Sequence, residues 1–463
     1  MEGFRDSCGL VGVSGRAHAA HVVALGLHGL QHRGSREVGV ASSDGHLLRL
    51  HRGTGLVRDV LGDPQLQGLP GRSAVGAVNG RADRPADAME ASTGLVFAHW
   101  RDGQVAATVA GRFSNGTRLR RELREHGSLF QTMADAEVLL HLVAQSSQRT
   151  LVNRLVDALW KVDGGFCVLV LTEDAMIAVR DPRGVRPLVL GRLGDGWAVA
   201  SEDTALRLVG AEPTRSLAPG EMLIVEGDGA PKSVRPFVAR DRAACVHELV
   251  DLAREDATAF DRHVAEARTS LGQRLARERG CPSRSVIVGL PGAGETIAVG
   301  FAQGVRARLV RGLVASPAPP IGLPGDSQEE VPWTAIPSAV SDNDVVLVVP
   351  SISTGKGVAG AVGLLRQAGA RSIHIRAASP PLRHGCPYGV SSPTSDELAA
   401  TRARESGALA RLLGADTVDF LTEEGLHAVA GRRADDKPSW CDACFSGKLP
   451  ISPEEPEDQL PLF

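Results

Sequence analysis

The sequence predicts an α+β domain built from layered antiparallel sheets, followed by an α/β domain with a parallel sheet. Two observations carry this prediction. Up to about residue 238, short β-rich runs alternate with turns, as antiparallel strands do. Beyond it, the runs at 285–291 and 344–357 are continuously apolar and lead into Gly-rich turns and helical patterns, which is typical of parallel strands buried on both faces.

The individual elements follow from periodicity. Helical spacing covers residues 20–30 and 122–144. A Pro-rich stretch at 316–333 predicts a long loop in the second half. The apolar face of the second helical stretch consists of Val138, Leu139, Leu142 and Val143. The strands expected in the first half lie at 9–13, 38–42, 167–172, 176–180, 187–191 and 197–201.

Composition excludes several classes of protein. The chain has 463 residues, 43% of them hydrophobic, which is enough for two or three domains with cores of their own. A formal net charge of -3, without a basic stripe, argues against nucleic acid as a partner. No apolar run approaches the roughly 18 residues that indicate a membrane span. The N-terminus has no secretory signal, so we expect a cytoplasmic protein.

The seven cysteines are an odd number, which favours catalysis or metal binding over a disulfide framework. Cys8 precedes the apolar run GLVGV, and a cysteine in that position is often a small core residue. Removal of residues 1–7 would instead give Cys8 a free α-amino group with a pKa of roughly 7.7–8.0, able to act as base toward its own thiol. We therefore predict a propeptide over residues 1–7 and an N-terminal nucleophile at Cys8.

The segment that begins at Cys8, together with GLHGLQHRG at 26–34, resembles the glutaminase domain of the glutamine phosphoribosylpyrophosphate amidotransferase family. The resemblance implies an αββα N-terminal-nucleophile domain over residues 8–238 and a phosphoribosyltransferase-like domain over residues 239–463. The family reaction converts glutamine and phosphoribosylpyrophosphate into phosphoribosylamine, glutamate and pyrophosphate. The motifs that continue the resemblance lie at 126–142, 178–191, 201–213, 243–256, 344–357 and 364–381.

The resemblance implies roles for residues around the nucleophile, and it also implies that two substrate-contacting residues of the family are replaced. Arg33 and Asp135 match substrate-binding residues, and Asp135 matches the acid that holds the α-amino group of glutamine. Asn79 stands where the family has the arginine that binds the glutamine carboxylate, so a charged bidentate contact is lost. In the oxyanion hole, Gly111 matches the family's glycine amide, whereas Ala110 replaces the asparagine donor.

The phosphoribosyltransferase-like site is altered further. The family's two consecutive acids, which bind the ribose hydroxyls, are replaced by Val349 and Pro350, and this argues against a Mg²⁺ site. Part of the phosphate-binding turn persists, because turn amides at a helix N-terminus attract an anion. The residues that match this turn are Ser351, Thr354 and Gly355, and Lys356 replaces a threonine of the family.

Four cysteines match the ligands of the family's iron-sulfur subgroup. The C-x-x-C pair presents two thiolates on one loop, and a four-thiolate set suits a [4Fe-4S] cluster or zinc. We expect the cluster, in a structural role, because the short extension before Cys8 also belongs to that subgroup. The expected ligands are Cys245, Cys386, Cys441 and Cys444.

The family's structural motifs persist in this sequence, whereas residues that contact substrate in the family are replaced at both sites. This combination predicts a diverged member of the family. Three functions remain open. In the first, Cys8 attacks an amide or acyl group of a different substrate, with Gly111 as the oxyanion donor. The second is a non-catalytic iron-sulfur scaffold or regulator, and the third is an active amidophosphoribosyltransferase of purine synthesis. The resemblance also implies a small-molecule substrate and a homo-oligomer.

Overall fold

A computed structural model describes most of the chain. The predicted propeptide, except for the backbone of residues 5–6, lies outside the described residues, and so does nearly all of the Pro-rich stretch. No helix in the described part of the chain is long and apolar enough to cross a membrane. The described ranges are 5–6, 8–80, 94–100, 103–238, 240–315, 333–431 and 440–451.

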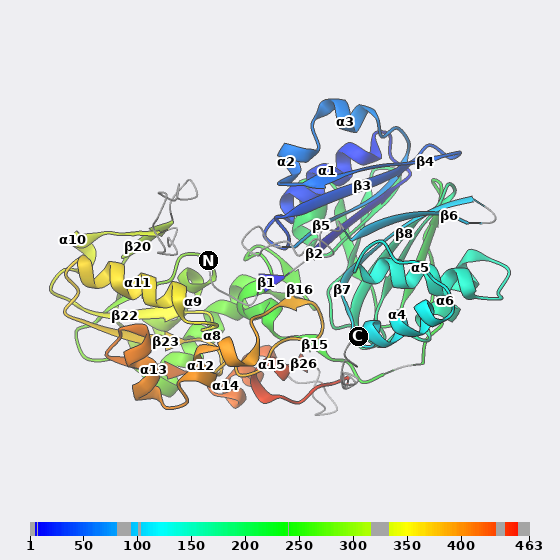
Figure 1. The fold of residues 1–463 in the computed structure, drawn as a ribbon. Helices are drawn as coiled ribbons and strands as arrows, with labels where there is room; N and C mark the ends of the chain where they lie inside the picture. Colours follow the sequence, from blue (N-terminus) through cyan, green and yellow to red (C-terminus); the bar gives the residue numbers. More distant parts are fainter. Residues whose placement is uncertain are drawn as a thin grey trace, which may run out of the picture. The chain divides into compact units, whose positions relative to one another are not determined.

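The chain divides into two compact units, which are coloured along the sequence in Figure 1. The four-residue segment Pro387–Val390 belongs to the unit formed mainly by the first half of the chain, although the second half supplies it. The N-terminal unit comprises Asp6–Cys245, Pro387–Val390 and Leu449–Phe463. The C-terminal unit comprises Met1–Arg5, Val246–Cys386 and Ser391–Lys448.

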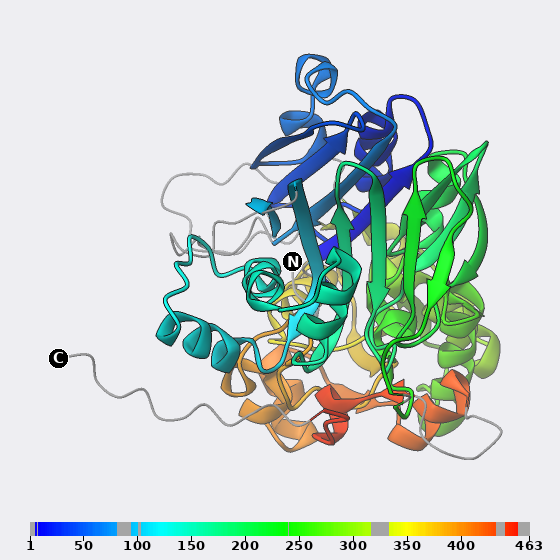
Figure 2. The ribbon, with the colours of Figure 1, turned by 90° about the vertical axis from the view of Figure 1, so that its right-hand side faces the viewer.

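Two sheets form the middle layers of the N-terminal unit, and every strand pairing described within them is antiparallel (Figures 1 and 2). The seven-stranded sheet has the order β12 (Glu212–Ser216), β10 (Val189–Leu193), β11 (Gly196–Ala200), β2 (Cys8–Ser14), β5 (Ser73–Asn79), β3 (Glu37–Ser43) and β4 (Leu48–Thr54). The six-stranded sheet has the order β14 (Lys232–Val234), β13 (Met222–Glu226), β9 (Ala175–Arg180), β8 (Gly164–Leu171), β7 (Gly103–Phe113) and β6 (Leu95–Trp100).

Helices cover the outer face of each sheet, because alternate strand residues on both faces are apolar. Val11 and Val13 of β2 pack against the first helical layer, whereas Leu10 faces the core between the two sheets. The predicted αββα layering is therefore confirmed. The first layer consists of α1 (Ala19–Gly29), α2 (Val57–Val60), α3 (Asp63–Gln67) and α7 (Asp203–Leu208). The second consists of α4 (Gly116–Glu125), α5 (Asp135–Gln145) and α6 (Leu151–Leu159).

The prediction of one continuous helix over residues 122–144 is wrong, because residues 122–125 end α4 and residues 135–144 belong to α5. A loop separates α4 from α5, and Gly127 in this loop has a φ of +88°, a left-handed conformation that glycine adopts without strain. The Glu137 carboxylate of α5 then accepts N–H groups of the loop at 2.7 and 2.8 Å. The left-handed turn at Gly127 and the hydrogen bonds to Glu137 separate the two helices, although apolar residues recur at helical spacing through the whole stretch.

The C-terminal unit is built on a five-stranded sheet in which all neighbouring strands run parallel, as the sequence predicts. One face packs against α11 (Lys356–Gln367) and α13 (Ser406–Leu413). Residues that point to the other face, such as Ile287 and Val346, are fully buried as well. The strand order is β19 (Arg308–Leu309), β18 (Val286–Gly289), β22 (Asp344–Val349), β23 (Ser372–Ala377) and β25 (Thr417–Phe420).

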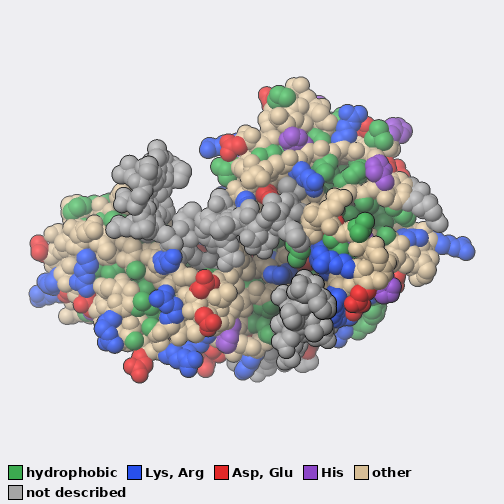
Figure 3. Space-filling model, in the orientation of Figure 1, with side chains coloured by type: hydrophobic (Ala, Val, Ile, Leu, Met, Phe, Trp, Pro, Cys, Tyr) green, Lys and Arg blue, Asp and Glu red, His purple; other side chains and the backbone are tan. Residues whose placement is uncertain are grey.

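Further helices and short elements complete this unit. Basic side chains lie among acidic ones on the face shown in Figure 3. The remaining helices are α8 (Val264–Arg279), α9 (Ala293–Val305), α10 (Pro337–Val340), α12 (Ala399–Arg402), α14 (Glu423–Ala430), α15 (Ala443–Ser446), η1 (Glu248–Leu252) and η2 (Ser395–Glu397). The short strands are β1 (Arg5–Asp6), β15 (Ala244–Cys245), β16 (Thr258–Ala259), β17 (Arg262–His263), β20 (Leu313–Ala315), β21 (Trp333–Ala335), β24 (Val390–Ser391) and β26 (Trp440–Cys441).

Candidate functional site

Cys8 is the first residue of β2, which lies between β11 and β5 in the seven-stranded sheet. Its side chain is only 4% exposed and packs into the core between the two sheets. Directly opposite it on β5 stands Asn79. The residue predicted to replace the family's carboxylate-binding arginine is therefore the cross-strand neighbour of the predicted nucleophile.

The main-chain amide of Gly111 lies against the Cys8 thiol. Its N–H group donates a hydrogen bond to Sγ over 3.1 Å. Gly111 has a φ of +93°, and a β-carbon there would lie 2.1 Å from the carbonyl oxygen of Gly165 on β8. Only glycine fits this backbone, which turns the amide toward the sulfur and not into the regular strand ladder. An amide so placed can stabilise negative charge on a carbonyl oxygen that is attacked by Cys8.

Asp135 reaches the same end of β7. Its Oδ2 accepts the N–H of Phe113, two residues beyond Gly111, over 2.8 Å. Burial raises the pKa of Asp135 to about 6, although the Phe113 hydrogen bond and nearby arginines partly offset the effect. The carboxyl therefore titrates close to neutral pH, and only its ionised form can hold a substrate ammonium group.

This titration predicts a pH dependence. Because the pKa of Asp135 is about 6, the carboxylate is lost as the pH falls below that value, and binding of an amine-bearing substrate weakens. We expect kcat/KM of the wild-type protein to fall below pH 6. In Asp135→Asn the part of the fall that sets in at pH 6 should be absent, whereas the fall caused by protonation of the Cys8 α-amino base should remain, and kcat/KM at neutral pH should be lower. The measurement is kcat/KM between pH 5 and 8, and an unchanged fall below pH 6 in the variant would contradict this role of Asp135.

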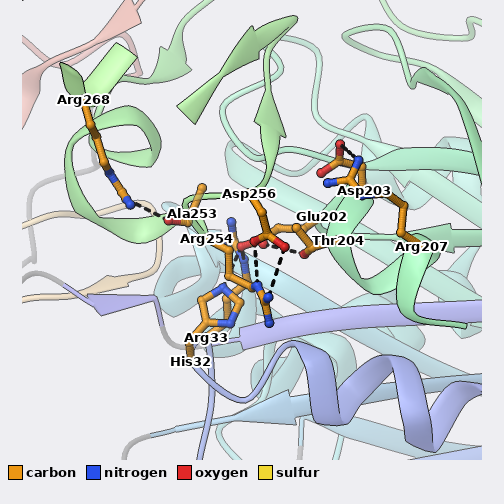
Figure 4. Close-up of polar contacts among 10 residues, drawn as sticks. All are labelled: His32, Arg33, Glu202, Asp203, Thr204, Arg207, Ala253, Arg254, Asp256 and Arg268. Carbon is orange, nitrogen blue, oxygen red and sulfur yellow. Dashed lines mark hydrogen bonds and ion pairs between the residues drawn. The ribbon is translucent and has the colours of Figure 1, made fainter. Parts of the chain in front are cut away.

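Arg33 is buried, with 1% of its side chain exposed, and its Nε donates to Oε1 of Glu202 over 2.6 Å. His32 contacts the same oxygen at 2.7 Å, and the Thr204 hydroxyl donates to the other oxygen (Figure 4). Burial of Glu202 opposes ionisation, but the guanidinium and the histidine outweigh it and hold the pKa of that carboxyl well below its usual range. The structure therefore gives Arg33 an internal ion pair, and its predicted contact with substrate stays a prediction.

The turn that carries Arg33 is fixed against β5. Gly34 lies so close to the strand that a β-carbon would approach the Asn79 nitrogen to 2.7 Å. The N–H of Arg36 donates to the Asn79 carbonyl over 3.2 Å. The ion pair with Glu202 thus anchors a turn that packs directly beside the residue opposite Cys8.

In the C-terminal unit, β22 ends at Val349 and α11 begins at Lys356. The side chain of Val349 is buried in the apolar core of the sheet, so it contributes nothing to a polar site. Gly355 precedes the helix with a φ of +87°. The predicted phosphate-binding residues, from Ser351 to Lys356, therefore form one turn at a helix N-terminus, where amides and the helix dipole attract anions.

Ser353 in this turn was not among the predicted site residues. It is 3% exposed, and its Oγ has no hydrogen-bond partner among the described residues. A buried hydroxyl without a partner is costly, which suggests a ligand atom as the missing acceptor or donor. The only signal in the sequence is that a third hydroxyl lies between Ser351 and Thr354.

A separate cavity of about 350 Å³ includes Arg311 and Glu295 but none of the residues of this turn.

The four predicted cysteine ligands are not shown to hold a metal. Within the described residues, no three Cys, His, Asp or Glu side chains lie together around a position for a single metal ion. Backbone hydrogen bonds link segments of the C-terminal unit that lie beside these cysteines in the chain. The carbonyl of Cys444 accepts the N–H groups of Arg383 and His384, and the Cys441 carbonyl accepts the N–H of Val246. Each of these donors lies within three residues of a further predicted ligand, Cys386 or Cys245.

Known proteins resemble the chain over almost its full length. The amidophosphoribosyltransferase of Bacillus subtilis strain 168 is 34% identical over 457 residues, which cover 97% of this chain and 95% of the relative. This chain belongs to the amidophosphoribosyltransferase family. The Rhizobium etli amidophosphoribosyltransferase is 34% identical over 463 residues and covers 96% of this chain and 92% of the relative. A family model described as a glutamine amidotransferase domain matches residues 96–208.

Solved structures of amidophosphoribosyltransferases share the fold. The glutamine phosphoribosylpyrophosphate amidotransferase of B. subtilis, complexed with ADP and GMP, has a TM-score of 0.89 at 33% identity and covers 97% of this chain and 98% of that chain. A structure titled as the allosteric regulatory enzyme of purine biosynthesis has a TM-score of 0.91 at 34% identity, with 97% of each chain covered. The family and fold inferred from the sequence motifs are thus confirmed, whereas the iron-sulfur subgroup stays a prediction.

Proposed function

We propose that this member of the amidophosphoribosyltransferase family is an N-terminal-nucleophile enzyme that cleaves an amide or acyl substrate through Cys8. The observation that carries the proposal is the 3.1 Å hydrogen bond from the Gly111 amide to the Cys8 sulfur. It pairs a nucleophile with a preorganised donor for an oxyanion, and these are the two groups that acyl transfer requires.

The chemistry follows from groups that lie at this end of β2 and β7. After removal of residues 1–7, the α-amino group of Cys8 takes the thiol proton, and Sγ attacks the substrate carbonyl carbon. The electron pair of the carbonyl bond moves to the oxygen, where the Gly111 N–H can donate. The pair then returns, the bond to the leaving amine breaks, and the α-ammonium group protonates that amine. Water or an acceptor amine releases the acyl group from sulfur.

The residue opposite the nucleophile argues for a substrate other than free glutamine. Asn79 is neutral, and it occupies the position next to Cys8 where the family's arginine would meet an α-carboxylate. An amide side chain can donate a hydrogen bond to a neutral acceptor, and it offers a carboxylate neither the positive charge nor the bidentate fork of an arginine. Asp135 still offers a carboxylate for an amine. We infer a substrate that carries an amine but has a neutral group in place of the α-carboxylate.

A matched pair of substrates tests this specificity. The wild-type protein should cleave glutamine and its α-carboxamide, glutaminamide, with similar kcat/KM, because Asn79 gives the carboxylate no charged partner. In Asn79→Arg, the ratio of kcat/KM for glutamine to kcat/KM for glutaminamide should rise by roughly 10–100-fold. This rise is equivalent to about 1.5–3 kcal/mol for a charge-assisted contact. Ammonia release measures both rates. A strong wild-type preference for glutamine, unchanged by the substitution, would overturn the inference.

Two further measurements, of pyrophosphate release and of the mass of the intact protein, test the two other functions that the sequence leaves open. Glutamine-dependent release of pyrophosphate from phosphoribosylpyrophosphate would identify an active amidophosphoribosyltransferase. An N-terminus that still carries residues 1–7, together with no turnover of any amide, would favour the non-catalytic scaffold. Intact mass of the purified protein reads the N-terminus directly, since a chain that starts at Cys8 has completed the self-processing that the mechanism needs.

We further propose that Cys245, Cys386, Cys441 and Cys444 hold a [4Fe-4S] cluster in a structural role. The donor chemistry fits, because four thiolates are the usual ligands of such clusters. Three of the four cysteines are buried, and the backbone hydrogen bonds to the Cys441 and Cys444 carbonyls bring together the loops that carry them. A bound cluster would supply a cross-link between chain segments, and no step of the acyl transfer passes through it.

Iron analysis of protein purified without air tests the cluster. Cys441→Ser should lose bound iron and sulfide and lower the midpoint of thermal unfolding, because one thiolate ligand is removed. The matched control is Cys281→Ser, which removes a partly exposed cysteine that matches no family ligand. Equal iron content in the wild type and in Cys441→Ser, or zinc in place of iron, would contradict the proposal.

A further inference from the structure

A short segment from the second half of the chain lies at the nucleophile. Residues Pro387–Val390 belong to the N-terminal unit, although the chain on both sides of them belongs to the other unit. Tyr388 is 1% exposed and Val390 5% exposed, so the segment is an integral part of this unit's interior. It lies far along the chain from Cys8 and Gly111.

Gly389 packs directly against Gly111. A β-carbon at Gly389 would lie 2.5 Å from both the Cα and the carbonyl carbon of Gly111, and 2.8 Å from its oxygen. Real β-carbons do not approach backbone atoms so closely, so any side chain at this position would displace Gly111 or the segment itself. The surface of Gly389 therefore limits where the Gly111 backbone, and with it the N–H that faces Cys8, can lie.

Tyr388 anchors the segment on two sides. Its hydroxyl donates to the carbonyl of Ile451 and accepts the N–H of the same residue over 3.1 Å. Its Cβ lies so close to Gly165 that a β-carbon on that glycine would approach it to 3.1 Å. Gly165 pairs with Arg112 on β7, the residue after Gly111. The segment is thus held at its tyrosine and pressed against the strand that carries the oxyanion donor.

We propose that Gly389 is a positioning residue for the oxyanion hole. By occupying the space behind Gly111, it holds the Gly111 amide in line with the Cys8 sulfur and the carbonyl oxygen under attack, and Tyr388 keeps it there. The inference rests on the proposed function, since it concerns the same nucleophile. It adds that a segment of the second half of the chain sets the efficiency of chemistry in the first.

Two reagents that attack the same thiol separate positioning from general structure. With p-nitrophenyl acetate, Sγ attacks the carbonyl carbon, a charged oxygen develops, and p-nitrophenolate leaves as the thioester forms. With iodoacetamide, Sγ displaces iodide and no charge develops on oxygen. Only the first reaction uses an oxyanion donor, so the ratio of acetylation to alkylation at Cys8, read by peptide mass, reports the Gly111 amide.

In Gly389→Ala, we expect this ratio to fall by about 10–100-fold, somewhat less than the roughly 10²–10³-fold that follows loss of a whole oxyanion donor. Alkylation by iodoacetamide should stay close to the wild-type rate. The matched control is Gly45→Ala, because Gly45 has nearly the same φ, +91° against +93°, but a β-carbon there meets nothing within 4 Å. It carries the same backbone strain without the contact and should keep the wild-type ratio.

Tyr388→Phe covers the case in which Gly389→Ala fails to fold. It removes the hydroxyl that binds Ile451. The ratio of acetylation to alkylation should fall by roughly fivefold, because loss of the hydrogen bonds to Ile451 costs about 1 kcal/mol. A wild-type ratio in folded Gly389→Ala, or in Tyr388→Phe if the former does not fold, would overturn the positioning role while leaving Cys8 chemistry intact. Wild-type protein that is alkylated but never acetylated at Cys8, or is modified by neither reagent, would instead overturn the proposed function.

Discussion

Replacing Cys8 with Ala is expected to abolish cleavage of every amide or ester substrate, with a loss of at least about 10³-fold in kcat. The reason is that the substitution removes the sulfur atom to which the Gly111 amide donates, and with it the proposed nucleophile. Release of ammonia or p-nitrophenolate gives the rate, and intact mass shows whether an acyl adduct forms. Cys8→Ala should also retain residues 1–7, since self-processing needs the same nucleophile.

The control for this variant removes a thiol elsewhere. Cys167→Ala is unsuitable because Cys167 is completely buried between the two sheets, where truncation leaves a cavity. Cys281→Ser avoids that difficulty, since Cys281 is partly exposed, and it should keep full activity. Residual turnover in Cys8→Ala close to the wild-type rate would show that the nucleophile lies elsewhere and would reject the proposed mechanism.

Glu202→Gln should destabilise the protein by about 3–5 kcal/mol, because it removes the negative charge from a buried ion pair with Arg33. Both side chains are nearly inaccessible, at 1% and 2% exposure, so water cannot replace the lost partner. Urea unfolding monitored by circular dichroism measures the change. Glu122→Gln is the control, since its ion pair with Arg118 is well exposed, at 45% and 38%, and should be worth less than about 1 kcal/mol.

The pH dependence of stability gives this ion pair a second signature. The pKa of Glu202 is depressed in the folded state, so ionised Glu202 contributes its full stabilisation above the ordinary glutamate pKa of about 4.3. That contribution declines as the pH falls below this value toward the folded-state pKa. The difference in unfolding free energy between wild type and Glu202→Gln should therefore be constant near neutrality and shrink in acid. A difference that grows in acid would exclude the assignment.

The site shows where sequence reasoning reached its limit. Cys8, Gly111 and Asp135 were found through short motifs, and the structure brings them to one end of β2 and β7. Glu202 lies in the motif at 201–213, yet the sequence assigned it no part, and it indicated no role for Gly389 either. The contacts of Glu202 with Arg33 and of Gly389 with Gly111 produce no pattern in the local sequence. In each case about 170 residues or more separate the two positions along the chain.

The sequence by itself determined the order of the layers, because strand periodicity and turn motifs act over a few neighbouring residues. Its motifs also identified the family by resemblance, and they predicted the nucleophile. Only the tertiary structure decided that Arg33 is committed to Glu202, that the helical pattern breaks at Gly127, and that Gly389 supports Gly111. The physical reason is that buried charges and close backbone contacts are satisfied by whatever segment the packing brings near. Their partners are therefore set by the fold and not by neighbours in the chain.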